Sequence, residues 1–371
     1  MTISSNSPPV TEQPAPRLEA LFPYKGLEVA KAKHQLFEST NGVNTIPMVY
    51  ENALVGIEVE VENIRKEVPI THYWSGKEDG SLRNNGAEYT SIPLRTHQVE
   101  TALNHLMTKL NMWNTPEFSP RTSIHIHLYV RDMTWDQVKT LLIFYAIFER
   151  HFFMLAGGTR EKSIFCVPLY KTKQLDLLPT LEHQARHWQK YSAINCGTIF
   201  GADGGIPCFG TVEFRHLYGT SDVSTIVEWI NNILCLRKAV VEYKLEDVLN
   251  FLKTANTTSA YLAMYNRIFG KYAMPAALNK LDFELCITRT KLAFWGNSPE
   301  FTKYRYRKVS SYGKLKNTPK EAKINKAQLD EMMVKWAAPV GAPVGVFQNN
   351  AAAQPQLGQA GHEEIFDFIN N

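Results

Sequence analysis

Four short segments of the chain alternate apolar residues with side chains that can bind metal ions or phosphate. They are Val55–Val61, Gly86–Thr90, Ser123–Leu128 and Thr211–His216. Successive side chains of a β-strand point to opposite faces, so each segment has one apolar face and one chemically active face. Glu58 and Glu60, for example, share a face because Val59 separates them. The alternation predicts strands that gather carboxylates, imidazoles and a guanidinium on one side of a sheet.

This side of the predicted sheet has an unusual composition. Its side chains are Glu58, Glu60, Glu88, His125, His127, Glu213 and Arg215. A solvated sheet face would instead carry a mixture of Lys, Thr, Ser and Gln. Mg²⁺ binds carboxylate oxygens together with the phosphates of a substrate, and an imidazole can add one nitrogen ligand. We interpret the face as a metal-dependent phosphate site in which His125 or His127 supplies the nitrogen.

Each of these groups also has an ordinary structural explanation. Glu58 and Glu60 could lie on an exposed edge strand, although Glu is a poor strand former. Glu213 and Arg215 could form an ion pair on a sheet surface. Each histidine could be a hydrogen-bonded sheet residue. Asp79 precedes a glycine and is interpreted as a turn residue rather than a catalytic base.

Helical periodicity occupies much of the remaining chain. The predicted helices cover residues 27–37, 96–112, 138–155, 181–190, 223–243, 245–253 and 259–269. Asp222 is the predicted N-cap of the helix that follows it. The aromatic residues of 144–153 have helical spacing and are predicted to lie in the core. The combination predicts an α+β fold, with a mainly antiparallel sheet, helices packed on one face and an open catalytic face.

Composition divides the chain into four parts. Residues 1–20, rich in Ser, Pro and Thr, are predicted to be disordered, and residues 21–295 form the folded domain. Residues 296–336 are a basic segment. Residues 337–371 are a flexible linker that ends in a short acidic and aromatic tag. The tag is either a docking motif for a partner or a frayed terminus.

Charge and cysteine content exclude some classes of protein. The net charge of +4 over 371 residues does not by itself indicate a nucleic-acid partner. The five cysteines are an odd number without C-x-x-C spacing, which argues against a disulfide framework or a zinc knuckle. No apolar run approaches the ~20 residues of a membrane span, and the N-terminus lacks the pattern of a signal peptide. We expect a soluble cytoplasmic protein, in the host cytoplasm if the chain is viral.

Several blocks of sequence occur in an order that is more specific than any one of them. The blocks are Gly56–Glu60, Asp79–Ser81, Gly86–Pro93, Ser123–His127, Tyr191–Asn195, Thr211–Arg215 and Gly219–Thr220. Their order resembles that of the amidoligase family, within the carboxylate–amine ligase superfamily of glutamine synthetase and glutamate–cysteine ligase. The resemblance covers roughly residues 48–250.

This resemblance implies a glutamine-synthetase-like catalytic domain over residues 21–295 and ATP-dependent formation of an amide or isopeptide bond. In such a reaction a carboxylate attacks the γ-phosphate of ATP, ADP leaves, and an amine then displaces phosphate from the acyl phosphate. The implied cofactors are ATP and Mg²⁺ or Mn²⁺. The implied substrates are a carboxylate and an amine, carried on a peptide, a cell-wall precursor or a protein side chain.

The resemblance also implies how the metal ligands divide. Two or more ions would be held by Glu58, Glu60, Glu88, Glu213 and one of the two histidines, His125 or His127. We assign Glu60 and Glu88 to one ion. We assign Glu58, His125 and Glu213 to the other.

Three further roles follow from the resemblance. Arg215 would stabilise the transferring phosphoryl group, since a planar guanidinium matches phosphate geometry. Arg160 would meet a phosphate or the carboxylate substrate, and with Arg215 and Glu88 it completes the predicted catalytic set. Asn195 would bind the nucleotide phosphate, a carboxylate or the adjoining backbone.

An alternative hypothesis is a protein that keeps a ligase fold but binds nucleic acid or an assembly partner. It depends on residues 303–326, where Tyr304, Tyr306 and Tyr312 alternate with Lys and Arg. Aromatic rings there could stack on bases while the cations meet phosphates. A metal-dependent hydrolase is a weaker third hypothesis, because the chain lacks an H-E-x-x-H motif.

Overall fold

The structure is a computed structural model of the chain. It describes residues 15–21, 44–66, 68, 73–157, 160–172, 174–200, 209–254, 258–270, 286–287, 290–291 and 293–294. The chain divides into two units, 1–336 and 337–371, and all of the described residues belong to the first. The predicted helix 27–37, the basic residues 303–326, the linker and the C-terminal tag lie outside the described residues.

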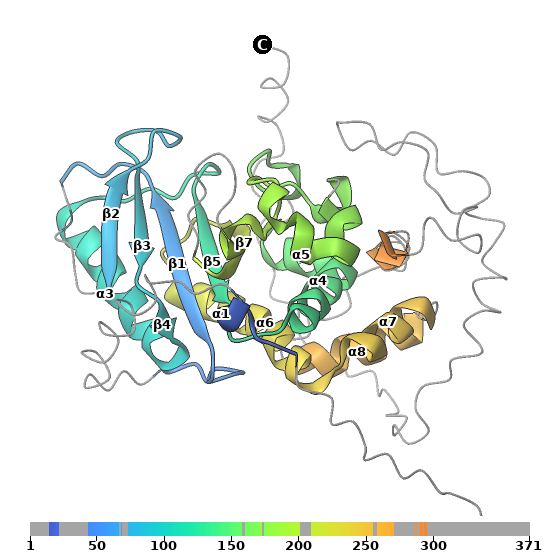
Figure 1. Ribbon diagram of the computed structural model, residues 1–371. Helices are drawn as coiled ribbons and strands as arrows, with labels where there is room; N and C mark the ends of the chain where they lie inside the picture. The colour runs from blue at the N-terminus through green and yellow to red at the C-terminus, as the bar shows by residue number, and fades with distance from the viewer. Residues whose placement is uncertain are drawn as a thin grey trace, which may run out of the picture. The chain divides into compact units, whose positions relative to one another are not determined.

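Within the described residues, seven strands form one sheet with the order β2-β3-β1-β5-β7-β6, and β4 pairs with part of β1 (Figure 1). The strands are β1 Leu54–Val61, β2 Trp74–Glu78, β3 Ala87–Ser91, β4 Leu94–Arg95, β5 Ser123–Tyr129, β6 Ile194–Asn195 and β7 Thr211–Tyr218. Every pairing between them is antiparallel. The predicted α+β class with a mainly antiparallel sheet is confirmed.

The helices agree closely with the periodicity of the sequence. They are α1 Leu18–Leu21, α3 Val99–Trp113, α4 Trp135–Leu155, α5 Leu181–Gln184, α6 Val223–Glu242, α7 Leu245–Thr254 and α8 Thr258–Phe269. Short 3₁₀ turns cover Thr96–Gln98, Arg160–Lys162, Leu169–Lys171, Gln174–Thr180, Ala185–His187 and Gly197–Ile199. The helix predicted over 181–190 is shorter than expected, because a 3₁₀ turn follows α5 at once.

Two long helices begin at side-chain caps. The Asp222 carboxylate accepts a hydrogen bond from the Ser224 amide at 3.1 Å, which confirms the predicted N-cap of α6. Thr134 and Gln137 form a reciprocal capping box, so α4 begins at Trp135, just before the long apolar stretch 138–155. These caps fix where each helix begins after the strand that precedes it.

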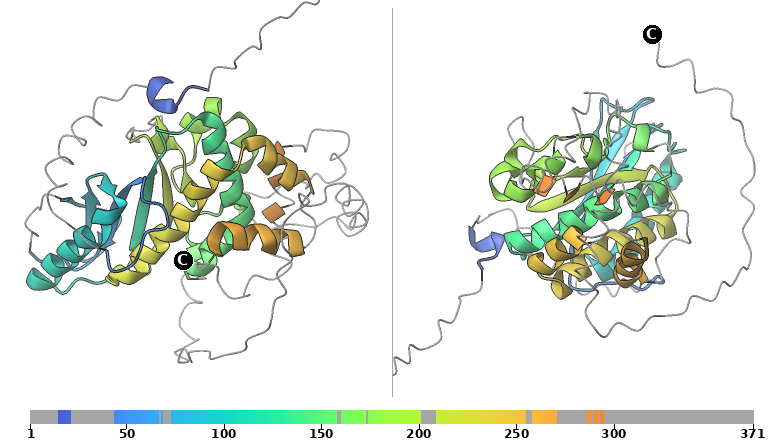
Figure 2. Two further views of the ribbon diagram at one scale, coloured as in Figure 1. Left: turned by 90° about the horizontal axis from the view of Figure 1, so that it is seen from below. Right: turned by 90° about the vertical axis from the view of Figure 1, so that its right-hand side faces the viewer.

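The core lies between one face of the sheet and the helices. The apolar residues of the alternating segments, such as Ile57, Ile126 and Phe214, are fully buried. α4 contacts β7, α6 contacts β5, and α3 and α4 both pack against α6, as the two views of Figure 2 show. The predicted core position of the aromatic residues in 144–153 is confirmed, since Phe144, Phe148 and Phe152 are all buried.

Two expectations about the whole chain can be compared with the described residues. No described helix is long and apolar enough to cross a membrane. Four of the cysteines, Cys166, Cys196, Cys235 and Cys286, are buried and free, as expected for passive core residues, and the fifth is outside the described residues.

Candidate functional site

The register between β1 and β5 brings the first acidic and imidazole groups together. Glu58 lies opposite His125, and Gly56 lies opposite His127. A side chain at Gly56 would start only 3.3 Å from the Cβ of His127, so the glycine leaves room for this imidazole. Period-two alternation and this register together place the Glu58, His125 and His127 side chains on the same face of the sheet.

On the other side of β1 the sheet adds carboxylates and a lysine. Glu60 lies opposite Glu88 of β3, and Glu88 lies opposite Lys77 of β2. The Lys77 ammonium is 2.8 Å from a carboxylate oxygen of Glu88. Like charges directly opposite one another destabilise a sheet, so Glu60 and Glu88 favour a cation between them.

Beyond β5 the sheet adds a third carboxylate, an amide and a guanidinium. Glu213 of β7 lies opposite both His127 and Asn195. A β-bulge follows, in which β7 has one residue more than β5. The pairs on either side of it are Ile126 with Phe214 and Ile124 with Leu217. Strand alternation places Arg215 on the cleft side, where it reaches the Glu213 carboxylate, while His216 faces the core and contacts Tyr145 of α4.

The side chains brought together in this way line one cleft, which has a volume of about 410 Å³. Its walls include Glu58, Glu60, Lys77, Asp79, Glu88, Ser123, His125, His127, Phe165, Tyr191, Asn195, Phe209, Glu213 and Arg215. Most of the polar groups are buried: Glu60, His125, His127 and Glu213 are each less than a tenth exposed. The face of the sheet that carries these groups therefore lines a cleft, as predicted.

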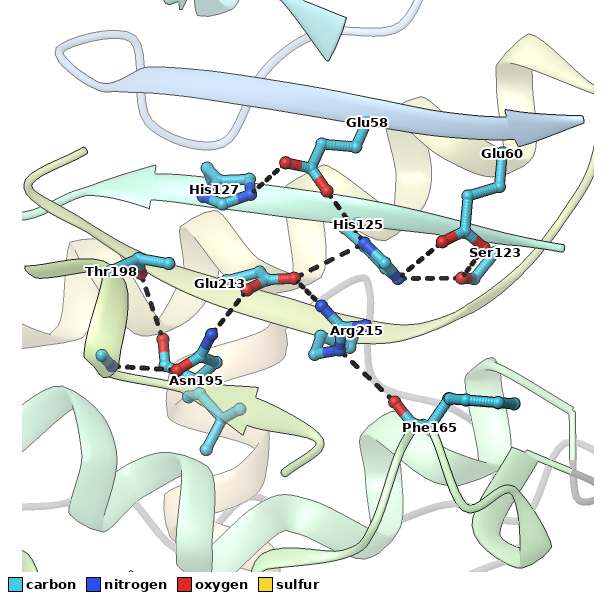
Figure 3. Close-up of polar contacts among 12 residues, drawn as sticks. Glu58, Glu60, Ser123, His125, His127, Phe165, Asn195, Thr198, Glu213 and Arg215 are labelled. Atoms are coloured by element: carbon cyan, nitrogen blue, oxygen red, sulfur yellow. Dashed lines mark hydrogen bonds and ion pairs between the residues drawn. The ribbon is translucent and has the colours of Figure 1, made fainter. Parts of the chain in front are cut away.

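Glu58 bridges the two histidines in the hydrogen-bond network of this cleft (Figure 3). One of its oxygens is 3.0 Å from Nδ1 of His125 and the other is 3.0 Å from Nε2 of His127. Burial opposes ionisation of Glu58, but the charge of His127 and the hydrogen bonds from both imidazoles hold its pKa well below the usual range. Glu58 is thus an ionised carboxylate that already faces positive charge.

The pKa of His127 changes in the complementary direction. Burial disfavours the imidazolium, yet the charge and hydrogen bond of Glu58, followed by the charge of Glu213, raise the pKa of His127. A proton on this imidazole therefore compensates the surrounding carboxylates. A metal ion could take over that charge, because metal ligation requires the neutral imidazole and releases its proton.

Glu213 is held from two sides. Asn195 donates from Nδ2 to one carboxylate oxygen at 2.8 Å, and Arg215 forms an ion pair with the other. Burial opposes ionisation of Glu213, but Arg215 and then His127 lower its pKa. The Asn195 carbonyl oxygen accepts from the Gly197 amide at 2.9 Å, so its amide group cannot rotate freely. Asn195 thus links the Glu213 carboxylate to the adjoining backbone.

The two histidines are not equivalent. His127 directs Nδ1 toward the Thr211 hydroxyl at 2.9 Å and Nε2 toward Glu58. An outer hydrogen bond of this kind is typical of metal-ligating histidines, because it orients the ring. His125 uses its ring nitrogens on Glu58 and on Ser123, at 3.0 and 2.8 Å. The geometry favours His127 as the nitrogen ligand.

Among the described residues, two groups of three have ligand atoms within 4.8 Å of one another. They are Glu58 with His127 and Glu213, and Glu60 with Asp79 and Glu88. The predicted partition placed His125 in the first group and left Asp79 out of the second. The strand register places His127 opposite Glu213, but Nδ1 of His125 also lies 3.0 Å from Glu58 and 3.4 Å from Glu213, so the partition stays a prediction.

Ser123, His125 and Glu58 follow the order of a Ser-His-acid triad. The Ser123 hydroxyl, however, also lies 2.5 Å from a carboxylate oxygen of Glu60. Glu213 is 3.4 Å from His125, so negative charge borders this group on two sides. Such surroundings oppose the oxyanion that a nucleophilic serine must generate, and we interpret Ser123 as a link between Glu60 and His125.

The expectation for Arg160 needs correction. Arg160 is buried and is not among the residues that line the cleft. Its Nε donates to the His216 carbonyl at 2.8 Å and a terminal nitrogen donates to the Arg215 carbonyl at 3.0 Å. Both carbonyls lie in the part of β7 where the register shifts, and the guanidinium donates a hydrogen bond to each. Arg160 therefore supports the backbone beneath Arg215 and does not contact the cleft.

Sequence reasoning missed three residues of the site. Asp79 does act as a turn residue, since its carboxylate accepts from the Ser81 amide at 2.8 Å, but it also belongs to the second acidic group. Ser123 precedes the His-x-His segment in alternation and could have been included on that basis. Lys77 gave no signal, because β2 is mostly exposed and does not alternate.

No protein-family model matches the sequence, and no curated protein matches it either.

Proposed function

We propose that the protein is an ATP- and Mg²⁺-dependent carboxylate–amine ligase, as its resemblance to the amidoligases implies. The observation that carries this proposal is the arrangement of two groups of metal-type ligands, with Arg215, in a single cleft. Two adjacent cation sites suit a reaction that must hold a triphosphate and neutralise it during transfer. The antiparallel sheet with a helical layer supports the further proposal of a glutamine-synthetase-like catalytic domain.

The donor atoms fit hard divalent cations. One group offers three carboxylates, and the other offers two carboxylates and an imidazole. Carboxylate oxygens suit Mg²⁺ and Mn²⁺, whereas zinc and copper sites are richer in sulfur and nitrogen. In our proposal Glu58, His127 and Glu213 hold one ion, and Glu60, Asp79 and Glu88 hold another. The ions would neutralise phosphate charge during transfer.

The chain's own residues then bind and orient the reactants. Arg215 has a planar guanidinium on the cleft wall, where it can pair with phosphate oxygens. Its Nε donates to the Phe165 carbonyl at 3.3 Å and it forms an ion pair with Glu213, so its position is fixed before a ligand arrives. Burial opposes its charge, but Glu213 and then Glu58 raise the pKa of Arg215, which keeps it cationic.

The proposed reaction has two steps. An oxygen of the carboxylate substrate attacks the γ-phosphorus of ATP, the bond to the bridging oxygen breaks, and ADP leaves. The amine nitrogen then attacks the acyl carbon, loses a proton and displaces phosphate, which leaves an amide. Catalysis in such a reaction consists largely of positioning and charge neutralisation. We propose a cytoplasmic location, where ATP and Mg²⁺ are supplied, and a peptide or protein among the substrates.

Isothermal titration calorimetry with a non-hydrolysable ATP analogue tests the proposal directly. We expect binding in the presence of Mg²⁺ or Mn²⁺, and binding at least tenfold weaker after EDTA or in Glu58→Gln, since a tenfold change is about 1.4 kcal/mol. Glu228→Gln is the matched control, because Glu228 is an exposed residue of α6, outside the cleft. Equal binding with and without a divalent cation, or in Glu58→Gln, would exclude this function.

A further inference from the structure

Lys77 forms a close contact with the second acidic group. It is in β2, directly opposite Glu88, and its ammonium is 2.8 Å from a Glu88 oxygen. Glu58 and Asp79 line the same cleft as Lys77. Lys77 is therefore a cation within the field of the acidic cleft.

The two partners of this ion pair differ in their freedom to move. The Lys77 side chain is 67% exposed, whereas that of Glu88 is 14% exposed. The Thr90 hydroxyl also donates to Glu88, at 3.2 Å, so the carboxylate is held in place without the lysine. A lysine side chain is long and flexible, and breaking an exposed ion pair between a lysine and a carboxylate requires little free energy.

We propose that Lys77 is a built-in counter-ion of the group formed by Glu60, Asp79 and Glu88, and that a divalent cation displaces it toward an anionic substrate. The inference rests on the proposed function, because it takes this group as a cation site. In the absence of metal, the ammonium offsets part of the repulsion among three carboxylates. When a divalent cation binds them, the ammonium and the ion repel each other, since both would lie within a few ångströms of Glu88.

The displaced ammonium has a defined use. Lys77 lies on the wall of the same cleft as Arg215, and its release provides a second cation for phosphate or carboxylate oxygens. Metal and anionic substrate then bind cooperatively, because the metal frees a group that the substrate needs. The chemical class recognised by Lys77 is an oxyanion, a phosphate of the nucleotide or the carboxylate of the acceptor.

Calorimetric titration of the nucleotide-free protein with Mn²⁺ tests the first half of this inference. Lys77→Met removes the competing cation, so we expect roughly three- to tenfold tighter Mn²⁺ binding at one class of site. Lys77→Arg retains the charge and should bind Mn²⁺ as the wild type does. Lys190→Met is the matched control. Lys190 lines the same cleft but its ammonium lies 5.9 Å from the centre of the Tyr191 ring.

The second half is tested at saturating Mn²⁺. The ATP analogue and a simple carboxylate are titrated separately, and Lys77→Met should weaken the binding of at least one of them by about threefold or more. The weakened ligand identifies the oxyanion that Lys77 meets.

The outcomes separate this inference from the proposed function. If the wild type binds Mn²⁺ and the analogue but Lys77→Met leaves the Mn²⁺ affinity unchanged, the counter-ion role is wrong and the ligase proposal stands. If Lys190→Met raises the Mn²⁺ affinity as much as Lys77→Met does, the inference is also overturned, because the effect would then reflect the general electrostatics of the cleft. Absence of Mn²⁺ binding in the wild type would contradict both.

Discussion

Arg215 is supported by Arg160, a residue that does not line the cleft. The Arg215 side chain lies on the same face of β7 as Glu213 and pairs with it, and the Arg160 guanidinium donates to the carbonyls of Arg215 and His216. The Arg215 amide is bound separately, by the Ala193 carbonyl at 2.9 Å. Hydrogen bonds to the backbone of β7 from two directions therefore fix the position of Arg215.

Arg160→Met should destabilise the protein while leaving the cleft composition unchanged. It removes the donors of two buried carbonyl groups, and each unsatisfied buried group costs about 1–3 kcal/mol. We expect a loss of roughly 2–4 kcal/mol in the free energy of unfolding, measured by urea denaturation. Arg160→Lys, which keeps a donor, should lose less.

Arg121→Met is the matched control for this measurement. Arg121 also donates to a carbonyl, that of Ser81 at 3.2 Å, but it is exposed and water can replace it. Its substitution should change the free energy of unfolding by less than about 0.5 kcal/mol. Equal losses for Arg121→Met and Arg160→Met would contradict the supporting role of Arg160.

At the scale of elements, three helices meet at a buried histidine. His151 of α4 donates from Nε2 to the Asn232 side-chain oxygen of α6 at 2.9 Å, and its Nδ1 lies 2.9 Å from the Tyr265 hydroxyl of α8. Burial lowers the pKa of His151 to about 4, and the hydrogen bond to Asn232 only partly offsets it. The helical layer therefore holds this imidazole neutral.

This histidine should make the fold acid-sensitive. In the unfolded chain His151 takes up a proton below its usual pKa of about 6.5, but in the folded protein only near 4, so folding is penalised as the pH falls through this window. The penalty approaches about 3 kcal/mol at pH 4. His151→Asn should have a lower free energy of unfolding than the wild type at pH 7 because packing is lost. This difference in the free energy of unfolding should shrink toward pH 4.5. Urea denaturation at several pH values measures this difference, and a deficit that stays constant with pH would refute the assignment.

Alternation made some strands predictable and left others hidden. β1, β3, β5 and β7 carry an apolar face buried under helices, so their period-two pattern is visible in the sequence. β2 has only one buried residue, Trp74, and β4 and β6 have two residues each, too few to alternate. Long helices were predictable because one stripe of each is buried, whereas α5 breaks into a 3₁₀ turn that periodicity does not mark.

The sequence predicts which residues belong to the site better than it predicts which of them contact one another. Alternation places His125 and His127 on one face, but only strand register shows that His127 lies opposite Glu213. Asp79 joins Glu60 and Glu88 through a turn whose path the sequence does not specify. The resemblance to amidoligases suggested Arg160 for the cleft, and it could not show that this guanidinium donates to backbone carbonyls of β7. Such features depend on contacts between segments far apart in the chain.

At the scale of the whole molecule, the first ligand group brings together residues from three neighbouring strands of the sheet. Glu58, His127 and Glu213 come from β1, β5 and β7, which are neighbours in the sheet but distant in sequence. The unfolded chain cannot assemble this group, so a metal ion that binds it stabilises only the folded state. Metal binding and the stability of the sheet are therefore linked.

Thermal unfolding should report this linkage. At a Mg²⁺ or Mn²⁺ concentration 100 times the dissociation constant, a single site adds about 2.7 kcal/mol, which corresponds to a rise in Tm of roughly 5–10 °C for a domain of this size. Glu213→Gln removes a ligand of the first group and should abolish most of the rise, whereas Glu228→Gln on α6 should keep it. Ca²⁺, which is larger and takes more ligands, should produce a smaller shift if the group is shaped for Mg²⁺. A Tm that does not depend on divalent cations would show that the acidic residues of the cleft do not form a metal site. Their charges would then be balanced by cationic side chains of the same cleft, His127, Arg215 and Lys77 among them.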